Sequence, residues 1–221
     1  MEPVAAAVDV TRTYGTAGRS TSALAGVTAS FPAGRVTVVA GPSGSGKSTL
    51  LRILGGLDVP SSGEVTVCGK DVSRMSAGAR RRLRRSDVAF LFQRPSDNLV
   101  SYLTAEQHLR LAAELRSFRL DDPAAAAEDL DLGHILDRRP HELSGGEQQR
   151  LGVAQAVVAS PPLLLLDEPT AELDHDNADR TIRLLHDVAA RGTAVVATSH
   201  DRSVVDAADE VVELVDGKVR D

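Results

Sequence analysis

The clearest chemical pattern in the chain is a glycine-rich loop that fits G-x-x-x-x-G-K-[ST] at each fixed position. It reads Gly41-Pro42-Ser43-Gly44-Ser45-Gly46-Lys47-Ser48-Thr49. Glycines let the backbone curl until several N–H groups point at one phosphate, while Lys47 adds positive charge and the Ser48 hydroxyl can bind Mg²⁺. The flanking residues 35–40 and 49–54 are typical of a strand and a helix. A glycine-rich turn without a ligand is the alternative, but the full match in this setting predicts a nucleotide-binding site.

Two adjacent carboxylates come directly after an apolar run later in the chain. Residues 163–166 predict a buried strand that delivers Asp167 and Glu168 at its carboxyl end. One carboxylate can hold Mg²⁺ through water while its neighbour polarises an attacking water. His200 follows a second predicted strand, residues 193–198, at the same edge of a parallel sheet. A lone histidine is usually structural, but at this edge it could donate a hydrogen bond to a phosphate.

Three more positions lie where a ligand could be bound. Gln93 ends an apolar predicted strand, although taken alone it would more often be an ordinary loop residue. Ser144 is placed to cap a helix that the pair Gly145-Gly146 begins, which makes a second potential anion site. Tyr14 could stack on an adenine, but its place in the turn-like residues 14–18 favours a locally packed side chain.

The composition excludes several classes of protein. The chain has 221 residues and 42% hydrophobic content, which suits one large domain or one domain with a lobe. A formal net charge of −6 offers no general surface for nucleic acid, so we expect none as a partner. The single cysteine, Cys68, excludes an intrachain disulfide and fits a reducing cytoplasm as a packing residue. No apolar run reaches the roughly 18 residues of a membrane span, so we expect another chain to cross any membrane.

The elements that must position these residues include both strands and helices, which predicts an α/β fold. Residues 4–10, 22–31 and 63–69 are typical of strands in an antiparallel cap before the nucleotide core. Residues 99–136 show helical spacing, with a capping-box pattern at Thr104. This helical insert predicts a separate lobe.

The run Arg80-Arg81-Arg82-Leu83-Arg84-Arg85 is the one dense basic segment. It could bind a phosphate-rich partner, including anionic lipid headgroups at a membrane surface. Because the run is short and lacks interleaved aromatic residues, a solvated helix face is the better interpretation.

Together these motifs resemble the ATP-binding-cassette (ABC) ATPases, and the resemblance covers essentially the whole chain. Six elements occur in the family's order: the Walker A loop at 41–49, the Q-loop glutamine Gln93, the signature at 143–150, the Walker B pair Asp167-Glu168, the D-loop at 171–174 and the switch histidine His200. P-loop and signature together are highly specific. The resemblance implies a P-loop NTPase core with an antiparallel β cap and an α-helical subdomain. Within one ATP-binding domain, residues 1–221, the core would be 1–92 and 159–221, and the mainly helical lobe 93–158.

The resemblance also implies a role for each site residue in binding and hydrolysing ATP. Glu168 would be the general base, and Tyr14 would stack on adenine, contrary to its local interpretation. The residues around the γ-phosphate would be Lys47, Gln93 and His200. The residues serving Mg²⁺ would be Ser48, Gln93 and Asp167. Further nucleotide contacts would come from Gly41, Pro42, Ser43, Gly44, Ser45, Gly46, Thr49, Ser144, Gly145, Gly146, Glu147 and Asp174.

Partners follow from the resemblance as well. In this family two subunits pair head to tail, so each ATP lies between the Walker A loop of one and the signature of the other. We therefore expect an ATP-dependent homodimer bound to transmembrane permease subunits. The chain would be cytoplasmic and peripheral on the inner face of the cell membrane.

A finer resemblance is to the lipoprotein-release and macrolide-export group of cassettes, through residues 54–58, the arginine-rich segment before 90–93, and 103–106. It implies export or a lipid- or lipoprotein-type substrate. The departures from that group's pattern are residues 94–98, Gln155 in place of a common arginine, and Glu172 in the D-loop.

Two other functions can be compared with transport. A soluble ABC ATPase for DNA or ribosome work would usually carry a long coiled-coil insertion or a second cassette, and the sequence shows neither. A nucleotide sensor without catalysis would not need Glu168 and His200, so a turnover assay separates it from an ATPase.

We expect the permease to dock beside Gln93, in a groove lined by residues 94–103. An amphipathic helix would fit a groove of mixed polar and apolar side chains. The alternative is that these side chains pack the core of the helical lobe itself. The apolar members of the segment are Leu99, Val100, Tyr102 and Leu103.

Overall fold

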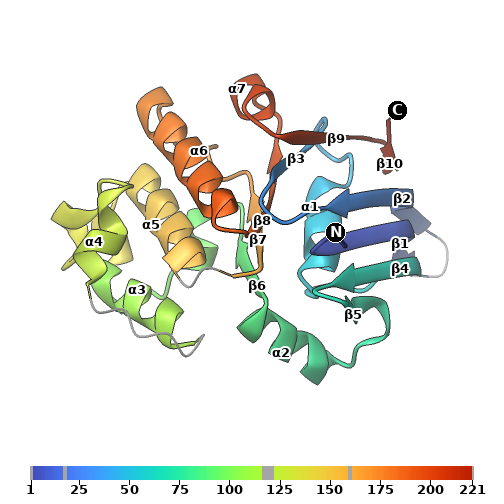
Figure 1. Ribbon diagram of the computed structural model, residues 1–221, viewed down its shortest axis with the longest axis horizontal. Coiled ribbons are helices and arrows are strands. Elements are labelled where there is room, and N and C mark those ends of the chain that lie inside the picture. The colour runs from blue at the N-terminus through green and yellow to red at the C-terminus, as the bar shows by residue number, and fades with distance from the viewer. Residues whose placement is uncertain (1, 17–18, 116–121, 159–160, 221) are drawn as a thin grey trace.

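The computed structural model describes residues 2–16, 19–115, 122–158 and 161–220, and a six-stranded sheet forms its centre (Figure 1). The strand order is β10-β9-β3-β8-β7-β6, with parallel pairing from β9 to β6 and an antiparallel β9–β10 pair. The strands are β3 (Val36–Ala40), β6 (Val88–Leu91), β7 (Leu163–Asp167), β8 (Ala194–Ser199), β9 (Glu210–Val215) and β10 (Lys218–Val219). The predicted α/β fold is confirmed.

A second, antiparallel sheet has the order β2-β1-β4-β5 and confirms the predicted cap. Its strands are β1 (Ala5–Thr16), β2 (Arg19–Phe31), β4 (Ser62–Val67) and β5 (Lys70–Asp71). The turn expected from Tyr14 onward is wrong, because Tyr14 continues β1 and pairs with Thr21. Threonines in this stretch favour the extended conformation over a turn. Ala17 and Gly18 of the expected turn lie outside the described residues.

Seven α-helices are present among the described residues. They are α1 (Lys47–Leu54), α2 (Ala77–Ser86), α3 (Ala105–Glu114), α4 (Pro123–Glu128), α5 (Gly145–Val158), α6 (His175–Ala190) and α7 (Arg202–Asp206). The predicted capping box is confirmed: the Thr104 hydroxyl accepts from Gln107 N, and Gln107 Oε1 accepts from Thr104 N. In Figure 1, α3, α4 and α5 gather on the side of the sheet away from the cap.

Alternation along the buried strands divides the core into two clusters. In β7, Leu164 and Leu166 belong to the cluster that includes α5, α6 and the helical lobe. Leu163 and Leu165 belong to the cluster that includes α1 and the cap. Because successive side chains of a strand point to opposite faces, one apolar strand can serve both clusters. Cys68 packs partly buried against the second cluster, and burial raises the pKa of its thiol, as expected of a packing residue.

Parallel pairing brings the carboxyl ends of four strands to one edge of the sheet. Ala40 of β3 is paired with Ser199 of β8, and Thr198 of β8 is paired with Asp167 of β7. β6 ends beside them, since Leu91 is paired with Leu166. The segments that follow these strands are the glycine-rich loop, Gln93, Glu168 and His200, so the sheet collects them at one place.

The basic run lies in α2, as expected from its interpretation as a helix face. Leu83 is its buried residue, while Arg81 and Arg82 are exposed. Arg80 Nη1 donates to the carbonyl oxygen of Met75, and Arg84 donates to that of Gly56. Two of the arginines therefore stabilise backbone carbonyls instead of facing water alone.

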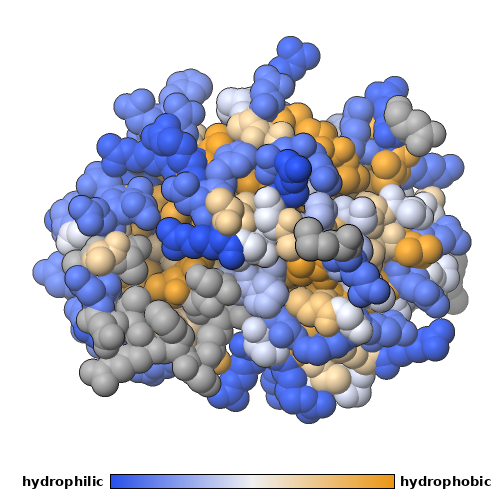
Figure 2. Space-filling view, viewed as in Figure 1, coloured by the Kyte–Doolittle hydropathy of each residue, from blue (hydrophilic) through white to orange (hydrophobic). Residues whose placement is uncertain are grey.

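On the face in Figure 2, hydrophilic side chains cover the outline and hydrophobic residues lie mostly in recesses between them. Within the described ranges, no helix is long and apolar enough to cross a bilayer.

His108 is fully buried in the helical lobe. Its Nε2 accepts from the Val100 N–H at 2.8 Å, and its Nδ1 lies 2.7 Å from the Thr104 carbonyl oxygen. These partners require the neutral ring with the proton on Nδ1. Burial lowers the pKa of His108, although the hydrogen bonds to Thr104 and Val100 oppose that shift.

We predict that His108 makes the protein less stable in mild acid. Its pKa is lower in the folded state than the roughly 6.5 of the unfolded chain, so stability falls as pH drops below that value, by at most about 1.4 kcal/mol per pH unit. Urea unfolding at pH 7.5, 6.5 and 5.5 measures this slope, which should become shallower in His108→Gln. The exposed His141, replaced in the same way, is the control and should keep the wild-type slope.

Candidate functional site

The glycine-rich loop connects β3 to α1 at the carboxyl edge of the central sheet. Gly41, Gly44 and Gly46 have φ angles of 149°, 80° and 105°, a region that glycine enters without strain. A Cβ on Gly46 would come within 2.4 Å of the Ala23 carbonyl oxygen. Helix α1 begins at Lys47 without a side-chain cap, so the N–H groups of its first turn are available to an anion.

Lys47 and Ser45 are the two polar residues of this loop that are buried. Lys47 Nζ donates to the carbonyl oxygens of Gly41 at 2.7 Å and Pro42 at 3.0 Å, which holds the ammonium at the loop. Ser45 is buried, and its Oγ has no hydrogen-bond partner among the described residues. Buried polar atoms usually have partners. The fixed ammonium in a loop of N–H groups fits a polyphosphate.

Asp167 links this loop to the sheet. Its Oδ1 accepts from the Ser48 hydroxyl at 3.0 Å and from the Thr198 hydroxyl at 2.7 Å. A serine hydroxyl beside a carboxylate is an all-oxygen donor pair of the kind that Mg²⁺ prefers. Three or more His, Cys, Asp or Glu side chains do not gather as a metal-binding cluster anywhere in the described part of the chain.

Glu168 lies next in sequence and has a φ of 52°, a left-handed conformation that is unusual for a residue with a side chain. Its side chain is 11% exposed, and its Oε1 and Oε2 lie 3.0 and 3.2 Å from His200 Nδ1. His200 is 71% exposed on the side chain. The pair therefore joins a nearly buried carboxylate to an imidazole that solvent or a ligand can reach.

The loop, Glu168 and His200 line one cavity of about 340 Å³. Its lining residues are Pro42, Ser43, Gly44, Lys47, Ser48, Gln93, Glu168 and His200. Gln93 is exposed and lies two residues beyond the end of β6. The structure thus brings the loop, Gln93, Glu168 and His200 together at one opening.

The glycine pair predicted as a second anion site is not among the residues that line this cavity. Ser144, exposed before α5, donates its N–H and hydroxyl to Glu147 Oε2 at 2.7 and 2.8 Å. Its backbone N–H lowers the pKa of Glu147. Gly145 and Gly146 lie against Glu172 of the D-loop. The signature therefore meets the D-loop of its own chain and not its own Walker A loop.

Asp174 caps α6. Its Oδ1 accepts from Asn177 N at 2.9 Å, and this backbone hydrogen bond is the main cause of its lowered pKa. The carboxylate is thus held by the helix that it begins.

Tyr14 lies in β1 and is held by two neighbours. Its hydroxyl donates to Asp58 Oδ2 at 2.7 Å, and the Arg12 guanidinium lies 4.5 Å from the centre of its ring. Asp58 also forms an ion pair with Arg12 at 2.8 Å. The tyrosine is 38% exposed, so part of it remains accessible to a ligand.

Two polar residues at the site were not predicted from the sequence. Thr198 contacts both Asp167 and Glu168, and the side chain of Gln149 donates to the carbonyl oxygens of Glu168 and Pro169 at 3.3 and 3.0 Å. Both are fully buried. A hydroxyl two residues before His200, directly after the apolar residues 194–197, was the available signal for Thr198.

Known proteins share this sequence pattern and fold. The ABC transporter family matches residues 24–171. The chain is also 37% identical, over 99% of its length, to the macrolide export ATP-binding/permease protein MacB of Escherichia coli O157:H7. The chain belongs to the ABC transporter family. It spans about a third of the length of that curated relative, 34%, and the match with MacB of Shigella boydii has the same extent.

Solved cassettes have the same fold as this ABC chain over nearly its whole length. A dimeric structure described as a post-hydrolysis state of the ATP-binding cassette MJ0796 bound to ADP and Pi has a TM-score of 0.91 and 30% identity, and it covers 98% of this chain and 97% of its own. The cbiO1 structure from Clostridium perfringens, described as part of the complex cbiONQ, has a TM-score of 0.83 and 27% identity, with coverages of 100% and 88%. The predicted P-loop NTPase fold of the ABC type is confirmed.

We predict that two glycines of the loop of this ABC cassette differ sharply in their tolerance of alanine. Both glycines adopt positive φ, so alanine at either position should lose about 1–2 kcal/mol of stability through backbone strain. Gly46→Ala should lose several kcal/mol more than Gly44→Ala, because of the two only a Cβ on Gly46 overlaps backbone. Within 4 Å, a Cβ on Gly44 meets nothing. Urea unfolding of the two variants measures the difference. Equal losses of stability would show that the Ala23 contact does not constrain the loop.

Proposed function

We propose that this chain is an ATP-binding and ATP-hydrolysing cassette that powers substrate movement through a membrane permease. The observation that supports it best is the convergence of Lys47, Ser48, Gln93, Glu168 and His200 on one cavity from four separate segments. A binding module for nucleotide alone would need the loop, but not a carboxylate and an imidazole opposite it.

In this proposal Glu168 is the general base for the attacking water. Its carboxylate is nearly buried and oriented by His200 Nδ1, which leaves the other imidazole nitrogen for the γ-phosphate. Lys47 and Gln93 contact the same phosphate from the loop and from the end of β6. The negative charge that develops on the phosphate during hydrolysis would thus be stabilised by groups that the sheet already holds in place.

Ser48 and Asp167 are the residues we propose to hold Mg²⁺, with Gln93 as a further ligand. The Ser48 hydroxyl donates to Asp167 Oδ1 at 3.0 Å, so the two side chains lie together where one cation would bind. When bound, Mg²⁺ would neutralise phosphate charge as hydrolysis develops.

The second anion loop supports a dimer. Ser144 to Glu147 begin α5 away from the cavity of their own chain, so a nucleotide in that cavity could be met only by the signature of a second subunit. We therefore propose an ATP-dependent head-to-tail homodimer, in which Asp174 and its D-loop approach the opposite site. Tyr14, partly exposed near the carboxyl end of β1, is proposed to stack on the adenine.

We propose that the chain acts on the cytoplasmic face of a membrane, as one ATP-binding domain with a core (1–92 and 159–221) and a helical lobe (93–158). The relatives named for macrolide export favour an export-type system. A lipid- or lipoprotein-type substrate is the alternative that the sequence pattern offers. Nucleic acid is not proposed as a partner.

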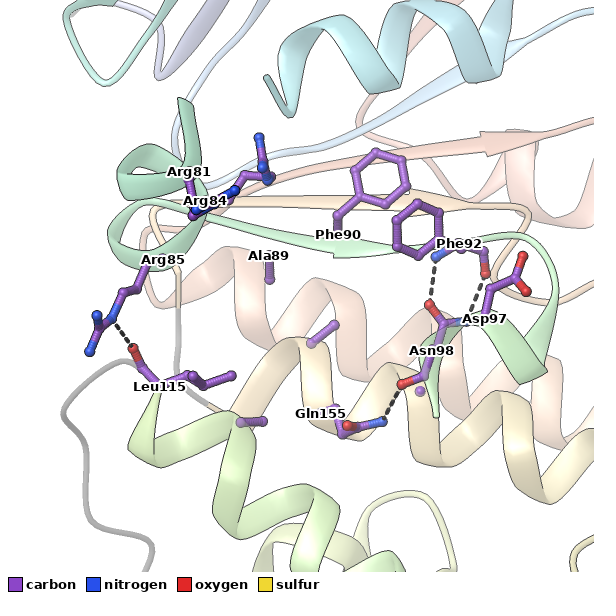
Figure 3. Close-up of a pocket in the computed structure, with 13 residues that line it drawn as sticks. Arg81, Arg84, Arg85, Ala89, Phe90, Phe92, Asp97, Asn98, Leu115 and Gln155 are labelled. Carbon is purple, nitrogen blue, oxygen red and sulfur yellow. Dashed lines mark hydrogen bonds between the residues drawn. The ribbon is translucent and has the colours of Figure 1, made fainter. Parts of the chain in front are cut away.

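A groove beside Gln93 suits the permease contact. It encloses about 610 Å³ between α2, β6, α3 and α5. Figure 3 shows Phe90 and Phe92 between arginines at one end and Asp97 at the other. Such a surface fits an amphipathic helix with an acidic and a basic end. The arginines are Arg81, Arg84 and Arg85.

This groove differs in its lining from the one expected from the sequence. Of residues 94–103, Asp97 and Asn98 line it. Leu99 packs partly buried against the core, and Tyr102 is 73% exposed. The apolar floor comes instead from β6, which the chain order could not place beside α5.

We predict that Lys47→Ala and Glu168→Gln both abolish ATP turnover but differ in binding. Loss of the ammonium in Lys47→Ala should weaken the binding of ATP. The amide in Glu168→Gln keeps the shape of the side chain and removes the base, so turnover should fall about 100-fold or more while ATP still binds. ATP should then hold Glu168→Gln as a dimer. Phosphate release and size-exclusion chromatography with and without ATP measure these effects.

Wild-type turnover in Lys47→Ala would contradict the assignment of the loop as the catalytic site. A monomer of Glu168→Gln under both conditions would contradict the paired-subunit model while leaving the ATPase assignment intact.

We predict that Arg81→Glu impairs permease assembly or transport while the ATPase rate of the isolated chain is preserved, because Arg81 lines the groove but not the nucleotide cavity. Arg82→Glu is the matched control, since Arg82 is exposed on the same helix and is not described as lining the groove. Reconstitution with the permease into vesicles measures both. Equal transport by the two variants would place the docking surface elsewhere.

A further inference from the structure

Thr198 lies fully buried near the end of β8, against the adjacent residues Asp167 and Glu168. Its hydroxyl donates to Asp167 Oδ1 at 2.7 Å. The same oxygen accepts from the Glu168 N–H at 2.9 Å. One hydroxyl therefore contacts the side chain of the proposed Mg²⁺ ligand and the backbone of the proposed base.

The direction of both hydrogen bonds is set by the groups involved. An ionised carboxylate can only accept and a backbone N–H can only donate, so the hydroxyl proton must point at Asp167. Asp167 Oδ1 then receives two hydroxyl donors, Thr198 from the sheet and Ser48 from α1. Two donors on one oxygen fix the rotation of the carboxylate and hence the direction of Oδ2.

The backbone bond matters because Glu168 is in the left-handed region, with a φ of 52°. A residue with a side chain persists there only when its surroundings hold it. The Glu168 N–H is held by Thr198, and its carbonyl oxygen accepts from Gln149 Nε2 at 3.3 Å. Thr198 is thus one of two side chains that hold the backbone in the conformation that points the Glu168 carboxylate at His200.

We propose that Thr198 is a positioning residue for ATP hydrolysis, which sets the orientation of Asp167 toward Mg²⁺ and of Glu168 toward the attacking water. The inference rests on the proposed ATPase function. It assigns to one hydroxyl two effects that would otherwise be independent: Mg²⁺ affinity and turnover.

A purely structural role would have a different consequence. If the hydroxyl served only to satisfy buried polar groups, its loss would lower stability without changing Mg²⁺ dependence. Partners that orient a metal ligand typically contribute 10–100-fold in metal affinity or activity.

Thr198→Val removes the hydroxyl at nearly constant volume, and Thr198→Ser keeps it. Should the valine variant fail to fold, Thr198→Cys replaces it, because a thiol is only a weak donor and acceptor. Thr37→Val is the matched control. Thr37 is buried in β3, paired with Val196 of β8, and its hydroxyl has no hydrogen-bond partner among the described residues.

Two measurements test the proposal. Steady-state phosphate release as a function of ATP and of Mg²⁺ should show kcat reduced about tenfold or more in Thr198→Val, with a smaller change in KM for ATP and a raised Mg²⁺ requirement. Fluorescence titration with a ribose-labelled ATP should show wild-type affinity in EDTA and a reduced gain in affinity on adding Mg²⁺. Thr198→Ser and Thr37→Val should match the wild type within about threefold.

Wild-type kcat and Mg²⁺ dependence in Thr198→Val would overturn the proposal, as would a serine variant that is as impaired as the valine variant. An equal loss in Thr37→Val would overturn it too, because the effect would then be general to the sheet. If the wild-type chain bound nucleotide but did not hydrolyse it, the proposed ATPase function would fail. In that case the gain in nucleotide affinity on adding Mg²⁺ tests the role of Thr198 by itself.

Discussion

The carboxylate of Asp167 is the contact on which the geometry of this site depends. Its Oδ1 accepts from Ser48 at the start of α1 and from Thr198 of β8, and Asp167 itself ends β7. Three segments far apart in sequence are therefore tied to one oxygen atom. Charge-assisted hydrogen bonds of this kind are about twice as strong as neutral ones, and here they are nearly buried. The glycine-rich loop is thus attached to the sheet at both of its ends.

The peptide after Asp167 is where the sheet meets the helical lobe. Glu168 adopts a conformation that costs a residue with a side chain about 1–2 kcal/mol, and Gln149 of α5 donates to its carbonyl oxygen and to that of Pro169. Because α5 begins at the signature, a displacement of this helix would act directly on the backbone of the proposed base. The lobe and the catalytic edge are therefore mechanically connected within one chain.

A second connection lies at the other end of the lobe. The Asn98 side chain accepts from the Phe92 N–H at 2.7 Å and donates to the Phe92 carbonyl oxygen at 2.8 Å, so it holds the backbone of the residue that precedes Gln93. Gln155 of α5 donates to the carbonyl oxygen of Asn98 at 3.4 Å. The sequence resemblance predicts departures from the macrolide-export pattern at residues 94–98 and at Gln155, and in the structure these two places contact each other. They form part of the groove proposed for the permease.

The sequence by itself determined the family, the α/β fold and the chemical groups, because these depend on local patterns: the loop motif, the apolar strands and the polar residues that end them. It could not determine distances between segments. The contact of Thr198 with Asp167 and Glu168, the extension of β1 through Tyr14, and the apolar floor of the groove all depend on strand pairing between residues far apart in the chain. Periodicity reports which face of an element is buried, but only tertiary packing decides which neighbour buries it.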